Sequence, residues 1–135
     1  MFPKSIEYSL KILIWIYQNY NGVPFSGDDI AKGAFIPKNY NLKLLQKLVK
    51  GKFLKSQKGK GGGFLPVDNS FLIEDVIKWI DGELSTQKCI LGLDLCKDDT
   101  PCPFHGSFKD IKNKFYDDIL NKDISSFCNN NTYFK

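Results

Sequence analysis

The sequence predicts a mostly helical protein with one small β-hairpin. Apolar residues recur at three- and four-residue spacing in several segments, which is the pattern of helices with one buried face. Two short apolar stretches flank a run of glycines and lysines, which is the pattern of a hairpin. The chain has 135 residues, 42% hydrophobic and 25% charged. This composition fits one folded domain with an appended helix.

The first predicted helix covers residues 5–20. One apolar stripe runs along it, formed by Ile6, Leu10, Leu13, Ile14 and Tyr17. Ser5 is its expected N-cap, because a serine hydroxyl can accept a hydrogen bond from the first turn. Asn21-Gly22 followed by Pro24 is expected to end it.

A helix-turn-helix is predicted next. Ser26 is the expected N-cap of a short helix that Gly33 ends. After the connection 34–36, Pro37 suits the first turn of a third helix that runs to about Lys50. Its expected inward stripe is Tyr40 or Asn41, Leu44, Leu45 and Leu48. Two helices joined by so short a turn form a helix-turn-helix.

A hairpin is predicted after Gly51. Phe53-Leu54 and Phe64-Leu65 are the expected strands, and residues 55–63 form a tip rich in glycine and lysine. A hairpin in this place is the wing of a winged helix-turn-helix. A nucleotide-binding phosphate loop is the competing interpretation, but this glycine run precedes a strand and lacks the Gly-Lys-Ser/Thr ending of such loops.

The remaining residues are expected to form a fourth helix, an irregular loop and a long last helix. The fourth helix covers residues 72–80, and the loop covers 83–106. Residues 107–120 then place Phe108, Ile111, Phe115 and Ile119 on one face. Such a face needs a partner surface, so a second copy of the chain is expected to pack on it. The tail from Asp123 is polar and is expected to fray.

The predicted organisation is therefore a winged helix-turn-helix domain at 1–84, an irregular loop at 85–106, and a dimerisation helix with a polar tail at 107–135. No apolar run approaches the roughly 20 residues that span a bilayer. The N-terminus also lacks the pattern of a signal peptide. We therefore expect a cytoplasmic protein without a membrane partner.

Positive charge is concentrated in one segment. Residues 38–60 contain eight lysines and no acidic residue, whereas the rest of the chain is more acidic than basic. Such a segment is typical of proteins that bind the phosphate backbone of nucleic acids. The alternative is a solvated lysine face that serves solubility. The chain has no arginine, so bidentate guanidinium contacts to guanine are excluded.

Three cysteines and the single histidine form a cluster in the irregular loop. Cys89, Cys96, Cys102 and His105 follow the pattern C-x6-C-x5-C-x2-H. Three thiolates and an imidazole suit an iron–sulfur cluster or zinc. Structural disulfides and free thiols are two competing interpretations of the same cysteines. Cys128 is expected to be a packing residue. The chain shows no arrangement typical of an enzyme site, so we expect a protein that is not an enzyme.

Several motifs of the chain resemble one family of bacterial regulators. They are Glu7-Tyr8-Ser9-Leu10, Ile36-Pro37-x-x-Tyr40, Ser56-x-Lys58-Gly59-x-Gly61-Gly62-Gly63-Phe64, Asp75-Val76-Ile77 with Asp81-Gly82, and the three-cysteine loop. Together they resemble the Rrf2 family of winged helix-turn-helix transcriptional regulators. That family includes iron–sulfur and nitric-oxide sensors of the IscR and NsrR types.

The resemblance implies a homodimer that binds a pseudo-palindromic operator in double-stranded DNA. The C-terminal helix would form the dimer interface, the third helix would enter the major groove, and the wing would enter the minor groove. The residues expected to contact DNA are Lys38, Asn39, Tyr40, Lys43, Lys47, Ser56, Lys58, Lys60, Gly61 and Gly62.

The resemblance also implies that residues 1–84 are the DNA-binding domain and that residues 85–106 are a sensor loop. The sensor would be an iron–sulfur cluster. Cys89, Cys96 and Cys102 would ligate it, with His105 as the fourth ligand and Glu7, acting in trans, as the alternative. A two-iron two-sulfur cluster is favoured over a four-iron four-sulfur one. The expected function is that of a repressor that senses cluster status, redox state or nitric oxide. The alternatives are a cluster-free regulator of this family that responds to another signal, and a zinc-stabilised protein-interaction module.

Overall fold

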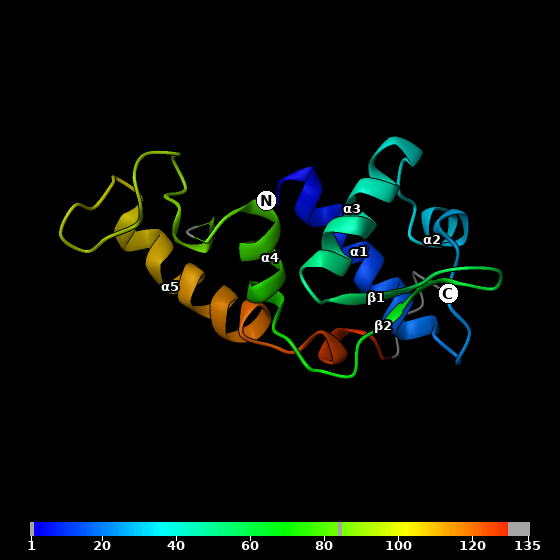
Figure 1. The fold of residues 1–135 in the computed structure, drawn as a ribbon. Coiled ribbons are helices and arrows are strands. Elements are labelled where there is room, and N and C mark those ends of the chain that lie inside the picture. Colours follow the sequence, from blue (N-terminus) through cyan, green and yellow to red (C-terminus); the bar gives the residue numbers. More distant parts are fainter. Residues whose placement is uncertain (1, 84, 130–135) are drawn as a thin grey trace.

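The computed structural model describes residues 2–83 and 85–129. Figure 1 shows the first helices of the chain and the hairpin gathered at one end, with a long helix and the loop that precedes it extending from the other. The two strands form one antiparallel sheet. The predicted fold class, mostly helical with a small β-wing, is confirmed. In the described ranges, no helix combines the length and apolar content needed to cross a membrane.

The central helix is α1 (Lys4–Asn19), which packs against α2, α3, α4 and strand β2. Its fully buried residues are Ile6, Ser9, Ile12, Leu13 and Ile16. The predicted N-cap was wrong: the helix begins one residue before Ser5, and Pro3 takes the capping position without a side-chain hydrogen bond. The backbone carbonyl of Ser5 instead accepts a hydrogen bond from the Ser9 hydroxyl at 2.7 Å.

The helix-turn-helix consists of α2 (Gly27–Gly33) and α3 (Lys38–Lys50). Ser26 caps α2 as predicted, and its hydroxyl accepts a hydrogen bond from the backbone N–H of Asp29 at 3.1 Å. Of the two candidates for the inward position, Asn41 is buried. Its Nδ2 donates to the carbonyl of Gly27 at 2.7 Å and thereby joins the two helices.

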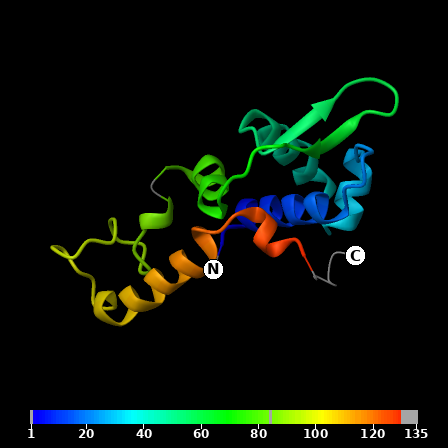
Figure 2. The same cartoon turned by 90° about the horizontal axis from the view of Figure 1, so that it is seen from below.

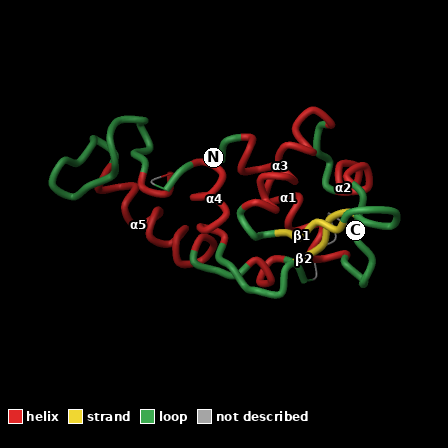
Figure 3. Tube along the Cα trace, in the orientation of Figure 1, coloured by secondary structure: helices red, strands yellow, loops and turns green. Residues whose placement is uncertain are grey.

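The wing is the hairpin of β1 (Leu54–Gln57) and β2 (Gly63–Pro66), drawn in yellow in Figure 3. In its register Leu54 lies opposite Pro66 and Gln57 opposite Gly63. Phe25, just before α2, pairs with Phe64 through two backbone hydrogen bonds of 2.9 and 2.8 Å. This pairing ties the base of the wing to the helix-turn-helix.

Helix α4 (Ile73–Asp81) follows the wing and buries Ile73, Val76, Ile77 and Ile80 against the core. The last α-helix, α5 (His105–Phe115), begins two residues before the predicted Ser107. A π-helical turn, Tyr116–Leu120, continues it to the predicted end. None of the residues of α5 is buried, and the side chain of Ile111 is 59% exposed.

The segment after Asp123 does not fray, so that prediction was wrong as far as residue 129. Residues Ile124–Phe127 form a 3-10 helix that packs against α1, as Figure 2 shows. The N–H of Ile73 donates to the carbonyl of Lys122 at 2.9 Å, and that of Ile124 to Phe71 at 3.3 Å. Ile124 and Cys128 are buried. The rest of the predicted tail, 130–135, lies outside the described residues.

Candidate DNA interface and sensor loop

Helix α3 has one buried and one exposed face. Asn41, Leu44, Leu45 and Leu48 face the core. The predicted DNA contacts of this helix are all on the exposed side: Lys38, Asn39, Tyr40, Lys43 and Lys47. Tyr40, 45% exposed, also packs on Tyr8 of α1 with ring centroids 5.3 Å apart. Burial of one apolar stripe therefore turns the cationic stripe of the helix to solvent.

Lys47 differs from the other lysines of α3, because its ammonium has a partner among the residues that the structure describes. Nζ of Lys47 donates to the carbonyl of Ile80 at 3.2 Å. In the opposite direction, Nε1 of Trp79 donates to the carbonyl of Lys47 at 2.9 Å. A cation near the C-terminus of α4 is also favoured by the helix dipole. The two bonds join α3 to the end of α4.

The tip of the wing extends away from the helices, as Figure 2 shows. Ser56, Lys58, Lys60 and Gly61 are exposed. Gly62 is half-buried, and a Cβ there would lie 2.0 Å from the carbonyl oxygen of Gln57, so this position requires glycine. The exposed lysines of the wing can therefore approach a phosphate backbone without a rearrangement of the fold.

The four predicted ligands lie together at one pocket. Cys89, Cys96, Cys102 and His105 all line a cavity of about 180 Å³ formed by the sensor loop and the first residue of α5. Sγ of Cys96 is 3.4 Å from Nδ1 of His105. The N–H of Leu91 donates to Sγ of Cys89 at 3.4 Å. This bond lowers the pKa of Cys89, with a further contribution from a hydrogen bond to Cys102.

The opposite side of the His105 ring faces Asp98. Nε2 of His105 is 2.8 Å from Oδ1 of Asp98, and Nζ of Lys109 lies 3.1 Å from the same oxygen. The hydrogen bond with His105, and then that with Lys109, lowers the pKa of Asp98. Sequence reasoning did not select Asp98, because nothing in the spacing of the loop's carboxylates distinguishes the one that meets the histidine.

The three cysteines and His105 lie near one another, but they are not arranged as a metal site. In the part of the chain that the structure describes, no three His, Cys, Asp or Glu side chains are arranged to hold a metal ion. Glu7, the predicted alternative ligand, pairs with Lys4 at 3.0 Å, and this interaction lowers the pKa of Glu7. Cys128 lies apart, where burial raises its pKa to about 11.

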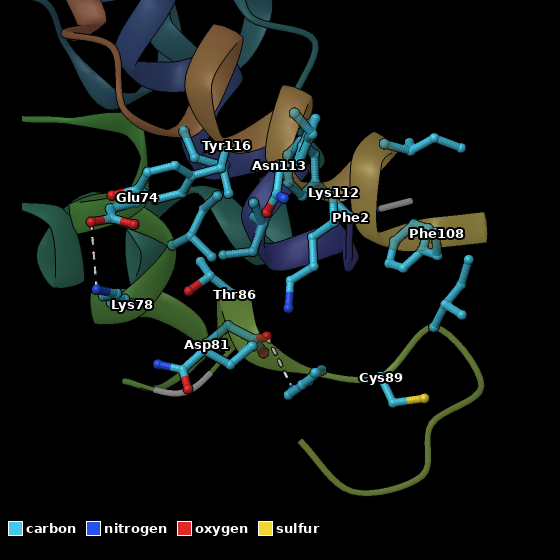
Figure 4. Close-up of a pocket in the computed structure, with 18 of the residues that line it drawn as sticks. Phe2, Glu74, Lys78, Asp81, Thr86, Cys89, Phe108, Lys112, Asn113 and Tyr116 are labelled. Carbon is cyan, nitrogen blue, oxygen red and sulfur yellow. Dashed lines mark hydrogen bonds and ion pairs between the residues drawn. The ribbon is translucent and has the colours of Figure 1, made fainter. Parts of the chain in front are cut away.

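A larger cavity of about 760 Å³ lies between α4, α5 and the N-terminal residues. Figure 4 shows its lining, with Cys89 at one end. Ion pairs link Lys78 to Glu74 at 3.5 Å and Lys88 to Asp81 at 3.4 Å on its walls. Because Lys88 precedes Cys89, the second pair connects the sensor loop directly to the end of α4.

Comparisons with known structures agree with this fold. The structure of CymR (YrzC), the global cysteine regulator of B. subtilis, matches with a TM-score of 0.72 and 18% identity over 95% of each chain. The structure of T. potens IscR matches with a TM-score of 0.67 and 16% identity, covering 93% of this chain and 83% of that one. At these identities, the likeness shows the fold.

Sequence comparisons identify the family. A protein of Haemophilus influenzae (strain ATCC 51907 / DSM 11121 / KW20 / Rd), named as an HTH-type transcriptional regulator, is 30% identical over 108 residues, which cover 78% of this chain and 71% of that protein. A protein of Aquifex aeolicus (strain VF5) with the same name is 25% identical over 96% of this chain and 92% of its own length. The model of the Rrf2 family, described as an iron-dependent transcriptional regulator, matches residues 2–130. The chain therefore belongs to the Rrf2 family of transcriptional regulators.

Proposed function

We propose that the protein is a homodimeric repressor that binds a pseudo-palindromic operator and senses iron–sulfur cluster status, redox state or nitric oxide through its Cys3His loop. The observation that carries the proposal is the convergence of Cys89, Cys96, Cys102 and His105 on one pocket in a chain whose family is described as iron-dependent.

The proposed DNA surface is the exposed side of α3 together with the wing. Lys38 and Lys43 project from the helix, and Lys58 and Lys60 from the hairpin tip. The segment that contains them has no acidic residue to oppose a phosphate backbone. Each lysine that neutralises a phosphate releases counterions, so affinity for duplex DNA should fall steeply with salt.

The residues around the pocket fit an iron–sulfur cluster in chemistry. Thiolates, with an imidazole in place of one of them, are known ligands of such clusters. Cys89, Cys96, Cys102 and His105 would hold the cluster, and the loop between the cysteines would have to draw together around it. When bound, the cluster would supply a group that oxidants and nitric oxide attack. The four side chains would tie the loop to the N-terminus of α5.

The proposed dimer interface is the apolar face of α5. The side chain of Ile111 is 59% exposed, and that of Ile119, in the π-helical turn after α5, is 36% exposed. Large apolar side chains in such a row on a helix favour packing against another protein surface. A second copy placed there would set the spacing of the two recognition helices, so a change in the adjacent sensor loop would alter operator affinity.

Anaerobic purification tests the sensor. Freshly prepared protein should absorb visible light and contain iron and sulfide. A single Cys96→Ala variant should lose much of this absorbance while retaining its helical circular dichroism. Colourless wild-type protein with stoichiometric zinc would contradict the cluster and support the zinc-stabilised interaction module instead.

Operator binding tests the DNA surface. A duplex selected from a random pool by repeated binding serves as the probe, titrated at several salt concentrations. Lys58→Ala should lower the slope of log affinity against log salt by about 1.8, because each of the two subunits loses one phosphate contact worth about 0.9. Lys122→Ala, at an exposed lysine outside the cationic segment, is the matched control and should leave it unchanged. A wild-type affinity independent of salt would contradict the proposal.

A cluster-free regulator that responds to another signal is the second candidate. It is favoured by the finding that, within the described ranges, the donors are not already arranged as a metal site. In that case the metal-free protein should bind the selected duplex tightly, and reconstitution with iron and sulfide should not alter the affinity.

A further inference from the structure

We propose that Asp98 is a positioning residue that orients His105, so that Nδ1 is the ring nitrogen presented to the cluster. The inference deepens the proposed function and rests on it.

The two edges of the His105 ring have different partners. Nδ1 lies 3.4 Å from Sγ of Cys96, on the side of the pocket. Nε2 lies 2.8 Å from Oδ1 of Asp98, on the other side. The His105 side chain is only 13% exposed, whereas that of Asp98 is 74% exposed. The ring is therefore held in place, with its outer edge against a carboxylate at the surface.

Helix geometry explains why this contact is specific. Residues four apart lie on the same side of a helix, so α5 presents His105 and Lys109 to the loop together. Lys109 Nζ lies 3.1 Å from the same Oδ1 of Asp98. The carboxylate is thus held by two groups of one rigid element, although it belongs to an irregular loop.

The consequence for metal binding follows from the chemistry of imidazole. A ring nitrogen that carries a hydrogen has no lone pair for a metal, and a carboxylate acceptor keeps the hydrogen on the nitrogen it faces. Asp98 accepts from Nε2 and so leaves the lone pair on Nδ1. Such outer partners also raise the basicity of the ligand, and their loss typically lowers metal affinity about 10- to 100-fold.

The first test uses the metal-free full-length protein. His105 is the only histidine, so 15N-histidine labelling reports on one ring. In the wild type, Nε2 should carry a hydrogen that is protected from exchange with water. Asp98→Ala should abolish the protection, while Asp99→Ala, at the neighbouring carboxylate, should preserve it. A ring whose hydrogen resides on Nδ1 alone, or equal protection in both variants, would overturn the assignment.

The second test uses Co²⁺ alone as the probe, because its thiolate absorption reports binding. Asp98→Ala should weaken Co²⁺ binding by about 10- to 100-fold, and Asp99→Ala by less than about twofold. Asp98→Asn keeps an acceptor oxygen and should recover part of the loss. Equal affinities for Asp98→Ala and Asp99→Ala would overturn the role of Asp98. Circular dichroism identifies a misfolded Asp98→Ala protein, in which case Asp98→Asn and Asp99→Ala are compared.

The two proposals fail in different ways. Wild-type protein that takes up no cluster under anaerobic reconstitution, but shows the expected Nε2 hydrogen and the Asp98-dependent Co²⁺ affinity, would refute the cluster and support the positioning role. A wild-type cluster whose absorption spectrum and stability are unchanged in Asp98→Ala would refute the positioning role and leave the cluster intact.

Discussion

Replacing Gly63 with alanine should loosen the wing from the helix-turn-helix. Gly63 is the first residue of β2 and has φ +151°. A Cβ at this position would lie 2.2 Å from the carbonyl oxygen of Phe25 and 3.3 Å from the N–H nitrogen of Ser26. Because Phe25 also pairs with Phe64, the added methyl group would push apart the two segments that hold the base of the wing.

Two effects should lower the free energy of unfolding of Gly63→Ala. Backbone strain in a conformation suited to glycine costs about 1–3 kcal/mol. The Phe25–Phe64 pairing contains two hydrogen bonds, of 2.9 and 2.8 Å, each worth about 1 kcal/mol net. The free energy of unfolding should therefore fall by about 4 kcal/mol if both bonds are lost. Gly22→Ala is the matched control, because Gly22 has φ +103° and a Cβ added there would meet no atom within 4 Å. Its free energy of unfolding should fall by the backbone strain alone, about 2 kcal/mol.

Urea unfolding at one protein concentration measures both variants, because the stability of the proposed dimer would depend on concentration. A Gly63→Ala loss that equals the Gly22→Ala loss would refute the reasoning, since it would mean that the contact with Phe25 adds nothing. Operator affinity should also fall in Gly63→Ala at temperatures where it stays folded, whereas Gly22→Ala should bind as the wild type does.

Five further variants test the helix-turn-helix. Lys43→Ala should lower the salt slope of operator binding by about 1.8, that is about 0.9 for each of the two subunits. Lys47→Ala should change the slope less and lower stability by about 1 kcal/mol, because its ammonium donates to Ile80, and equal slope changes would contradict this distinction. Trp79→Phe removes the donor to the carbonyl of Lys47 and should cost about 1 kcal/mol in urea unfolding; an unchanged midpoint would show that the bond contributes nothing. Ser26→Ala should cost about 1 kcal/mol and Ser26→Gly only a few tenths, so equal losses would exclude a capping role.

Local pattern was enough to predict the α-helices and the hairpin, although not the N-cap of α1 or the 3-10 helix after Asp123. The N-cap at Ser26 and the end of α3 at Gly51 follow from interactions within one or two turns, which residue type largely decides. The wing follows from two short apolar stretches around a glycine-rich tip. In these elements, the periodicity of apolar residues and the chemistry of the ends agree, so little depended on distant contacts.

Prediction from the sequence failed where contacts with residues distant in the chain determine the local structure. The segment after Asp123 is polar in composition, yet Ile124 and Cys128 are buried there. Backbone bonds to Phe71 and Ile73 hold it in place. The choice of Asn41 over Tyr40 for the inward position likewise depends on the carbonyl of Gly27 in the neighbouring helix. None of these partners is near in sequence.

The sequence by itself determined the helix-turn-helix with its wing, the concentration of lysines from 38 to 60, and the donor types of the sensor loop, because all three depend on residue identity and short-range spacing. Only the tertiary structure decided that Lys47 reaches the end of α4 and that Asp98 meets His105. Those contacts join groups on separate elements, whose approach is set by how the apolar faces pack rather than by the spacing of the polar residues themselves.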